Sequence, residues 1–273
     1  TISQLGYMML GMGVGAYDDS LFHLFTHAFF KCGLFLAAAV IIDQFHQIST
    51  QSRDGVPAYN DIRNMGGLWR EMPLVFRLFM FMMLALVGIP FTSGFLSKEG
   101  IIMGVIDWAT LHGGWAWGLP FLALLGVLLT AFYMGRMTMW VFLGKKRNEV
   151  QIQKVSWKMI VPLGGMALGS FWFPLAWNPF ESTGWFISSF NIPLQIFQTR
   201  SYEPIESHHL IWTLVSVSLA LSGLLLAYFL FTKEKEAPAY TWLRRLSEQH
   251  FFQDQLYEGV LAKGVLSFVR IWV

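Results

Sequence analysis

The chain has 273 residues, of which 55% are hydrophobic and only 13% are charged. Because soluble globular domains carry about 25% charged residues, this composition excludes an ordinary soluble domain. The net charge of +2 comes without a basic stripe interleaved with aromatic residues, which excludes a nucleic-acid-binding protein. The single cysteine excludes an internal disulfide bond. The composition therefore predicts a protein whose surface faces lipid.

Long apolar stretches follow one another along the chain, most of them close to the length that crosses a bilayer. We expect transmembrane helices at residues 2–17, 20–42, 73–108, 117–143, 159–177 and 208–231. The predicted fold class is an all-α membrane protein, a polytopic transmembrane helix bundle. The chain begins without an initiator methionine, and its first residues have the composition of a helix interior. We therefore expect a fragment of a longer protein.

The second stretch carries three ionisable residues in the segment FHLFTHAFFK. His23, His27 and Lys31 are spaced four residues apart, so on a helix they form one polar stripe that climbs about 12 Å. A charged residue at the bilayer centre costs at least about 2.5 kcal/mol, so we expect the stripe to face the bundle or a hydrated cavity. Each histidine taken singly is equally well explained as a hydrogen-bonded packing residue. The stripe as a whole favours proton transfer, because histidine and buried lysine titrate readily.

The third stretch, 73–108, is too long for one straight span, since a helix of this length would measure about 54 Å. Its centre, residues 88–94 with the sequence GIPFTSG, must interrupt the helix. The stretch is either one discontinuous span or a hairpin of two short spans. Basic residues occur in 43–72 and cluster in 144–158, and only the discontinuous span places both loops in the cytoplasm. We therefore expect one discontinuous helix.

Lys98 follows this interruption by about one helical turn. Backbone that leaves a helix at membrane depth is found only where it is buried in protein or lines water, so Lys98 is expected near water. The alternative is a passive hinge, with Lys98 snorkelling to the outer interface. Glu99 is its neighbour in sequence but points about 100° away on a helix, so the two side chains need not pair.

The remaining polar residues give weaker signals. Arg136 lies in the stretch 117–143, where it either snorkels or serves as a cytoplasmic proton exit. His46 and His112 are expected to be solvated, and His208 and His209 to be interfacial. The histidines and the cysteine have no metal-ligand spacing, and no nucleotide-binding motif occurs, so we expect no metal and no cofactor in this chain.

Four motifs resemble one known family in the same order. TISQLGYM, FHLFTHAFFKCGLFL, DIRNMGGLWREMP and GIPFTSGFLSKEGI are similar to the antiporter-like subunit L of bacterial NADH–quinone oxidoreductase, respiratory complex I, and to the related mitochondrial subunit 5. The resemblance is strong over residues 2–105 and looser beyond, where FFQDQLYEGV is similar to another segment of the family. The same motifs occur in cation/proton antiporter subunits and in membrane-bound hydrogenases.

The resemblance implies roles for particular residues. Lys31 matches the central lysine of a proton channel, and His23 and His27 match the histidines that connect it. Lys98 matches the terminal lysine on the broken helix. Glu99 stands where the family more often has aspartate, and it is followed by Gly100 in place of a second acid, which leaves the role of that second acid open.

The resemblance also implies an organisation in three parts. Residues 1–143 would form the core of the proton-translocation module, 144–231 two further transmembrane helices, and 232–273 a cytoplasmic or interfacial segment leading to a lateral helix. The first of two inverted repeats would lie upstream.

The function implied is a proton-translocating subunit in a bacterial inner membrane, without a redox centre of its own. Partner subunits would hold NADH, FMN, iron–sulfur clusters and quinone. The alternatives are a cation/proton antiporter subunit, the membrane subunit of a hydrogenase, or a membrane scaffold that transports nothing.

Overall fold

The computed structural model describes residues 1–51, 61–62, 65–146, 154–176 and 206–232, together with Tyr257 and Lys263; side chains are described outside 47–51 and 206–208. The chain forms two compact units, Thr1–Thr232 and Lys233–Val273, and the helices below belong to the first. In the basic loop 144–158, residues 147–153 lie outside the described residues, and the basic segment 233–246 lies entirely outside them. The topology predicted from their charge therefore stays a prediction.

The first two helices form an antiparallel pair. α1 spans Ile2–Gly13, and α2 spans Tyr17–Gln51. The chain reverses at Gly15, whose φ of 86° is a left-handed conformation that glycine adopts without steric cost. α1 ends four residues earlier than expected because of this turn. α2 runs nine residues beyond the apolar stretch, since the polar residues that follow it include no glycine or proline to stop the helix.

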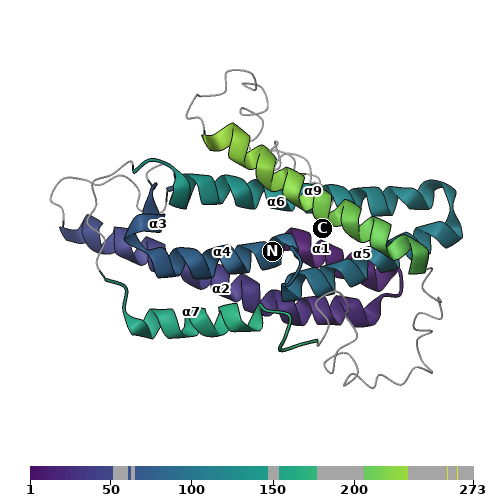
Figure 1. The fold of residues 1–273 in the computed structure, drawn as a ribbon, viewed down its shortest axis with the longest axis horizontal. Helices are drawn as coiled ribbons and strands as arrows, with labels where there is room; N and C mark the ends of the chain where they lie inside the picture. The colour runs from purple at the N-terminus through teal and green to yellow at the C-terminus, as the bar shows by residue number, and fades with distance from the viewer. Residues whose placement is uncertain are drawn as a thin grey trace. The chain divides into compact units, whose positions relative to one another are not determined.

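The third apolar stretch is a discontinuous helix, as predicted. After the short helix α3, Leu68–Glu71, the chain forms α4 over Pro73–Val87 and α5 over Ser93–His112. Pro73 opens α4 at a position where its missing N–H removes no helical hydrogen bond. Figure 1 shows α5 continuing in the direction of α4 along α2, and not folding back as a hairpin would.

The second half of the unit adds three helices. After the 3₁₀ turn Gly114–Trp117, α6 spans Gly118–Thr138 and ends in a π-helical turn, Met139–Leu143. α7 spans Trp157–Gly169, eight residues shorter at its end than expected. α9 spans Glu206–Thr232 and crosses α6, against which it packs most extensively (Figure 1).

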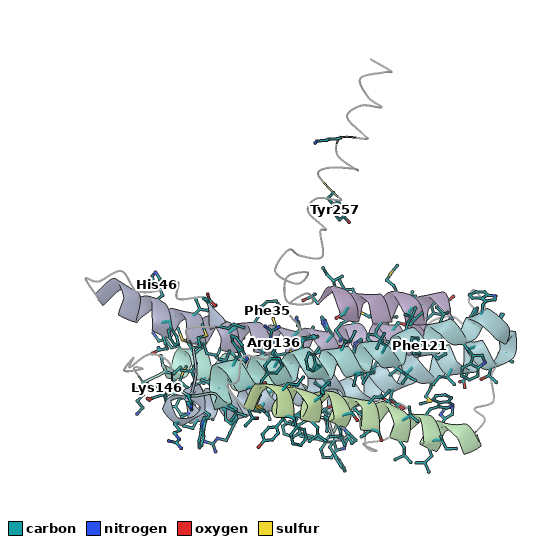
Figure 2. All side chains as sticks on the ribbon, turned by 90° about the horizontal axis from the view of Figure 1, so that it is seen from above. Phe35, His46, Phe121, Arg136, Lys146 and Tyr257 are labelled. Atoms are coloured by element: carbon teal, nitrogen blue, oxygen red, sulfur yellow. The ribbon has the colours of Figure 1, made fainter. Side chains whose placement is uncertain are left out.

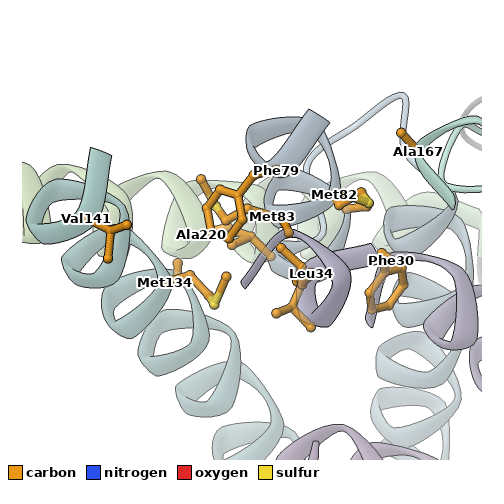
Figure 3. Close-up of a cluster of buried hydrophobic side chains, with 14 of the residues drawn as sticks. Phe30, Leu34, Phe79, Met82, Met83, Met134, Val141, Ala167 and Ala220 are labelled. Carbon is orange, nitrogen blue, oxygen red and sulfur yellow. The ribbon is translucent and has the colours of Figure 1, made fainter. Parts of the chain in front are cut away.

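Apolar side chains from all of these helices contribute to one core, part of which is drawn in Figure 3. Phe30 and Leu34 of α2 lie against Met82 and Met83 of α4, and Ala167 of α7 closes one side. Further contributions come from α6 and α9. The predicted all-α bundle is confirmed.

Three helices of the described part are long and apolar enough to cross a membrane by themselves: Tyr17–His46, Gly114–Leu143 and His209–Thr232. Pro73–Val87 is apolar but shorter, and it reaches spanning length only together with α5. Figure 2 shows apolar side chains such as Phe35 and Phe121 on the outside of the bundle, where they are 62% and 66% exposed. This outward apolar surface suits contact with lipid or with other membrane helices.

Candidate functional site

The interruption between α4 and α5 is built from a glycine stop and a threonine cap. Gly88 ends α4 with φ 90°, and its N–H donates to the carbonyl of Leu84 at 3.0 Å. Thr92 starts α5: its hydroxyl accepts from the N–H of Phe95 at 3.2 Å and donates to the carbonyl of Ile89 at 2.7 Å. Such a cap satisfies backbone groups that a helix end leaves unpaired.

The segment that follows α7 holds this interruption in place. The N–H of Ser93 donates to the carbonyl of Ser170 at 2.9 Å, and Thr92 forms an isolated antiparallel bridge with Phe171. The ring of Phe171 stacks on Phe81 of α4 at 3.9 Å between centroids. The backbone N–H of Ser93 is therefore satisfied by protein and does not depend on water or lipid.

α5 begins against the last turn of α4 at a contact only glycine permits. A Cβ atom added to Gly94 would collide with the backbone carbonyl of Ala85 and lie 3.2 Å from the ring of Phe30. The absent side chain lets the two half-helices overlap and brings Lys98 back towards the end of α4.

Lys98 is 3% exposed, and its ammonium nitrogen lies 3.5 Å from the carbonyl oxygen of Val87. The same nitrogen lies 4.9 Å from the ring centroid of Tyr7, whose hydroxyl donates to the carbonyl of Ala123. The end of a helix carries partial negative charge, and an aromatic face attracts a cation, so both neighbours stabilise a buried ammonium group. Lys98 does not reach the bundle surface, which argues against the snorkelling alternative.

His23 faces α5 and is 1% exposed. Its Nδ1 lies 2.9 Å from the hydroxyl of Ser97, and its Nε2 lies 3.1 Å from Oε1 of Gln4. A neutral ring satisfies both contacts, with Nε2 donating to the amide oxygen and Nδ1 accepting from the hydroxyl. Thr26 reaches the same hydroxyl at 2.8 Å, so Ser97 joins the stripe of α2 to the residue next to Lys98.

His27 and Lys31 continue the stripe along α2 towards the level of α4, since Phe30 lies against Gly94 and Gly33 against Met82. The ring centroids of His23 and His27 are 6.1 Å apart. This distance is too long for direct proton transfer but short enough for one bridging water. His27 is 7% exposed, and its Nε2 has no hydrogen-bond partner among the described residues. Lys31 is only half-buried, with its ammonium nitrogen 5.0 Å from the ring centroid of exposed Phe35.

α2 and α5 run antiparallel, and these contacts follow their shared face. We call the residues Lys98, Ser97, His23, His27 and Lys31 the α2–α5 polar line. It passes from the interruption of the broken helix to the outer face of α2. The structure thus brings Lys98, His23 and His27 together and places Lys31 at the end of the line.

Asp19 belongs to the same face and was not predicted from the sequence. Its side chain is 6% exposed, and its carboxylate lies against Gly100, where an added Cβ atom would strike it. The signal was available, because Asp19 precedes His23 by four residues and therefore extends the stripe by one turn.

Glu99 and Arg136 lie elsewhere. The carboxylate of Glu99 turns towards α9, where the hydroxyls of Thr213 and Ser216 hydrogen-bond to it. Arg136 is exposed on α6, 5.6 Å from each of the ring centroids of Trp140 and Phe231 (Figure 2). The structure does not bring Arg136 to the polar line.

Three of the weaker histidine signals are described, and the first of them, His46 near the end of α2, is exposed as expected. His112 is exposed, with Nδ1 2.8 Å from the carbonyl of Trp108. His209 contacts Asp107 across the interface between α5 and α9. Within the described residues, no three histidine, cysteine or acidic side chains gather as a metal site would require.

Residues 1–132 match the protein family described as NADH:quinone oxidoreductase/Mrp antiporter, TM. The chain is 32% identical to NAD(P)H-quinone oxidoreductase subunit 5 of Mesostigma viride chloroplasts over 284 residues, which are 97% of this chain and 40% of that protein. It is 31% identical over 301 residues to F(420)H(2) dehydrogenase subunit L of Methanosarcina mazei, covering 97% and 41%.

A shorter match is closer in sequence. NADH-quinone oxidoreductase subunit L of Mycobacterium tuberculosis is 39% identical over 149 residues, which are 54% of this chain and 21% of that protein. The chain spans about two fifths, or less, of the length of these relatives. Because residues 1–132 match the family and similarity to the subunit 5 and subunit L proteins extends over 97% of its length, the chain belongs to the NADH:quinone oxidoreductase/Mrp antiporter membrane family, as its motifs predicted.

Proposed function

We propose that this chain is part of a proton-translocating membrane subunit of NADH–quinone oxidoreductase and couples quinone reduction elsewhere in the complex to proton movement. The observation that carries the proposal is the α2–α5 polar line. Ionisable residues inside a bilayer are costly and are retained where protons or ions pass. Here three of them, Lys98, His23 and His27, are buried together beside an interrupted helix.

The line supplies a mechanism with protein groups alone. A proton held by Lys31 passes through water to His27 and His23, and from there through Ser97 to the neutral amine of Lys98. Lysine is the suitable end group because its charge changes with its surroundings, whereas arginine stays charged.

Repulsion between the two lysines makes the transfer controllable. Two unit charges about 10 Å apart repel by roughly 1.7 kcal/mol at an effective dielectric constant of 20. One proton moved across 100 mV stores about 2.3 kcal/mol. A charge that arrives near one lysine is therefore of the right size to expel a proton from the other.

The partner groups follow from the proposed complex. NADH, FMN, iron–sulfur clusters and quinone would reside in other subunits, and they would supply the electron transfer that drives the cycle. We place the chain in a bacterial inner membrane. The relatives differ in the electron donor that their names give, so the membrane part is proposed to work with more than one donor module.

Two lysine variants test the proposal. The assembled complex is reconstituted into vesicles, and proton uptake is measured for each electron pair delivered. We expect Lys31→Ala and Lys98→Ala to assemble and to lose most proton uptake, while Lys145→Ala, in the loop after α6, is the control. Normal proton uptake in both lysine variants would show that the polar line has only a structural role.

A cation/proton antiporter subunit is the second candidate, because the matched family includes Mrp antiporters. Purification from native membranes separates the two. Co-purifying redox subunits and NADH–quinone activity support the first candidate, whereas sodium-driven proton exchange without redox partners supports the second.

A further inference from the structure

A second set of polar side chains lies between α5 and α9. We call Glu99 and Asp107 of α5, with His209, Thr213 and Ser216 of α9, the α5–α9 seam. The three α9 residues are spaced by four and three, so they share one face of that helix. Apolar residues occupy the other faces of α9, among them Leu214, which is 58% exposed.

One end of the seam adjoins Lys98. The charges of Glu99 and Lys98 interact, and the hydroxyls of Thr213 and Ser216 hydrogen-bond to the Glu99 carboxylate. Oε1 of Glu99 is buried and has no hydrogen-bond partner among the described residues. A buried carboxylate oxygen without a partner is normally satisfied by a water molecule or by a bound proton.

The other end of the seam is a histidine–aspartate pair near the end of α5. Nε2 of His209 lies 4.0 Å from Oδ1 of Asp107, and the two side chains are 32% and 16% exposed. Asp107 follows Glu99 by eight residues, which on a helix is about 12 Å along the axis. The loop after α5 has no lysine or arginine, in keeping with the outer side of the membrane.

The buried polar atoms that lack partners trace both sets of residues. Five such side-chain atoms occur in the described part of the chain: Gln4 Nε2, His27 Nε2, Ser93 Oγ, Glu99 Oε1 and His209 Nε2. Gln4 and Ser93 flank the α2–α5 polar line, His27 is a member of it, and the other two atoms belong to the seam. Buried polar atoms in native proteins are satisfied by ordered water where protein does not reach them, so these positions mark sites for water along both sets of residues.

We propose that the α5–α9 seam is the outer half of the proton pathway, leading from Lys98 through Glu99 and His209 to the outer surface. This inference rests on the proposed function, because it extends the pathway that ends at Lys98. It gives Glu99 a role separate from pairing with Lys98, and it recruits a histidine and an aspartate that the sequence motifs do not mark.

Each transfer conserves protons. The Lys98 ammonium gives a proton to the Glu99 carboxylate, which leaves a neutral amine and a carboxylic acid. The acid passes that proton, through water held by the hydroxyls of Thr213 and Ser216, to Nε2 of His209. The imidazolium that forms is stabilised by Asp107, and it releases the proton to water outside, which restores every group of the seam.

Proton uptake by the reconstituted complex tests the histidine–aspartate pair. We expect Asp107→Asn and His209→Gln to lower uptake per electron pair by about a hundredfold, the lower end of what a positioned proton-transfer group contributes. The double variant Asp107→His with His209→Asp keeps one acid and one imidazole, and it should recover part of the loss. His112→Gln is the matched control, because His112 ends the same helix but is exposed and outside the seam.

Hydration of the seam has a separate test that does not depend on turnover. In a Cys32→Ala background, Thr213→Cys should react with a small charged thiol reagent added from outside. Leu214→Cys, one residue away on the outer face of α9, should not react. Charged reagents need water to reach a thiol, so the pair reports whether water enters the seam.

The outcomes separate this inference from the proposed function. Normal uptake in Lys98→Ala would remove the proposed function and the seam with it. Loss of uptake in Lys98→Ala, with normal uptake in both single variants of the histidine–aspartate pair and an inert Thr213→Cys, would overturn the seam alone.

Discussion

The two lysines of the polar line have opposite surroundings. Lys98 is enclosed by the end of α4 and the ring of Tyr7, and it is 3% exposed. Lys31 is half-buried, and its ammonium nitrogen lies over the ring of Phe35, which is itself 62% exposed. Lys98 is thus held by groups whose positions are fixed by the fold, whereas Lys31 is held by side chains at the surface that can move.

This difference suggests a division of labour. The backbone carbonyl and the aromatic ring around Lys98 cannot move without disturbing the fold. The protonation of Lys98 should therefore depend mainly on the charge of neighbouring residues. The surroundings of a half-buried lysine change when another helix or subunit packs over it. Lys31 is therefore the lysine whose protonation a neighbouring helix or subunit can change more easily. Four predictions break or sharpen this comparison.

The largest effect is expected at the contact that encloses Lys98. Gly94→Val places side-chain atoms against the backbone carbonyl of Ala85, and backbone yields less readily than a flexible side chain. We expect a loss of about 3 kcal/mol or more, at the upper end for overpacking. Thermal stability and the yield of assembled complex measure it. Gly165→Ala on α7 is the control, since an added Cβ atom there meets nothing within 4 Å.

Arginine substitutions compare the two lysine sites directly. Lys98→Arg buries a larger group with five donors beside one carbonyl acceptor, so we expect it to lower stability by about 2 kcal/mol. Lys31→Arg has room at the surface and should assemble normally, yet it should not pump, because arginine does not release its proton. A Lys31→Arg complex that pumps at the wild-type rate would contradict the assignment of a titrating role.

The histidines offer a smaller contrast of the same kind. His23→Leu leaves Oε1 of Gln4 without the ring N–H in a buried site, and an orphaned polar group costs about 1–3 kcal/mol, whereas Ser97 keeps Thr26 and the carbonyl of Ser93. His27→Leu removes a ring whose Nε2 has no hydrogen-bond partner among the described residues, so its stability should be close to that of the wild type. Melting curves of the two variants should therefore differ, whereas both should lose proton uptake. Equal melting temperatures would show that the contacts of His23 add nothing to stability.

The smallest effect on stability is expected for Pro90→Ala. The sequence by itself suggests that the helix would then run through the interruption and displace Lys98. In the structure, Gly88, Thr92 and the carbonyl of Ser170 each hold the interruption independently of Pro90. We therefore expect normal insertion and a moderate loss of proton uptake. Uptake as low as that of Lys98→Ala would mean that Pro90 alone sets the position of the lysine.

Sequence periodicity was sufficient for the features that depend on a single helix. The stripe of His23, His27 and Lys31 and the interruption at 88–94 follow from spacing and from glycine and proline, and the discontinuous helix is confirmed. Partners from distant segments could not be predicted in this way. Neither the bridge from Thr92 to Phe171 nor the contact of Glu99 with α9 has a local signal, because each depends on how helices pack.

Helix ends were predicted less well, for a related reason. Hydropathy stops where the apolar residues stop, whereas a helix continues until its backbone is interrupted. This is why α2 extends to Gln51, and why α7 ends at Gly169 although apolar residues follow.

The bridge between the interruption and the end of α7 also has a consequence for biosynthesis. The carbonyl of Ser170 that satisfies Ser93 is synthesised about 77 residues later, which at typical rates of translation is roughly 4–15 s. During that interval the nascent α4–α5 segment carries an exposed backbone donor that lipid cannot satisfy. The insertion machinery must therefore shelter this segment in a wet environment until α7 emerges, and α4 to α7 should leave it as one group.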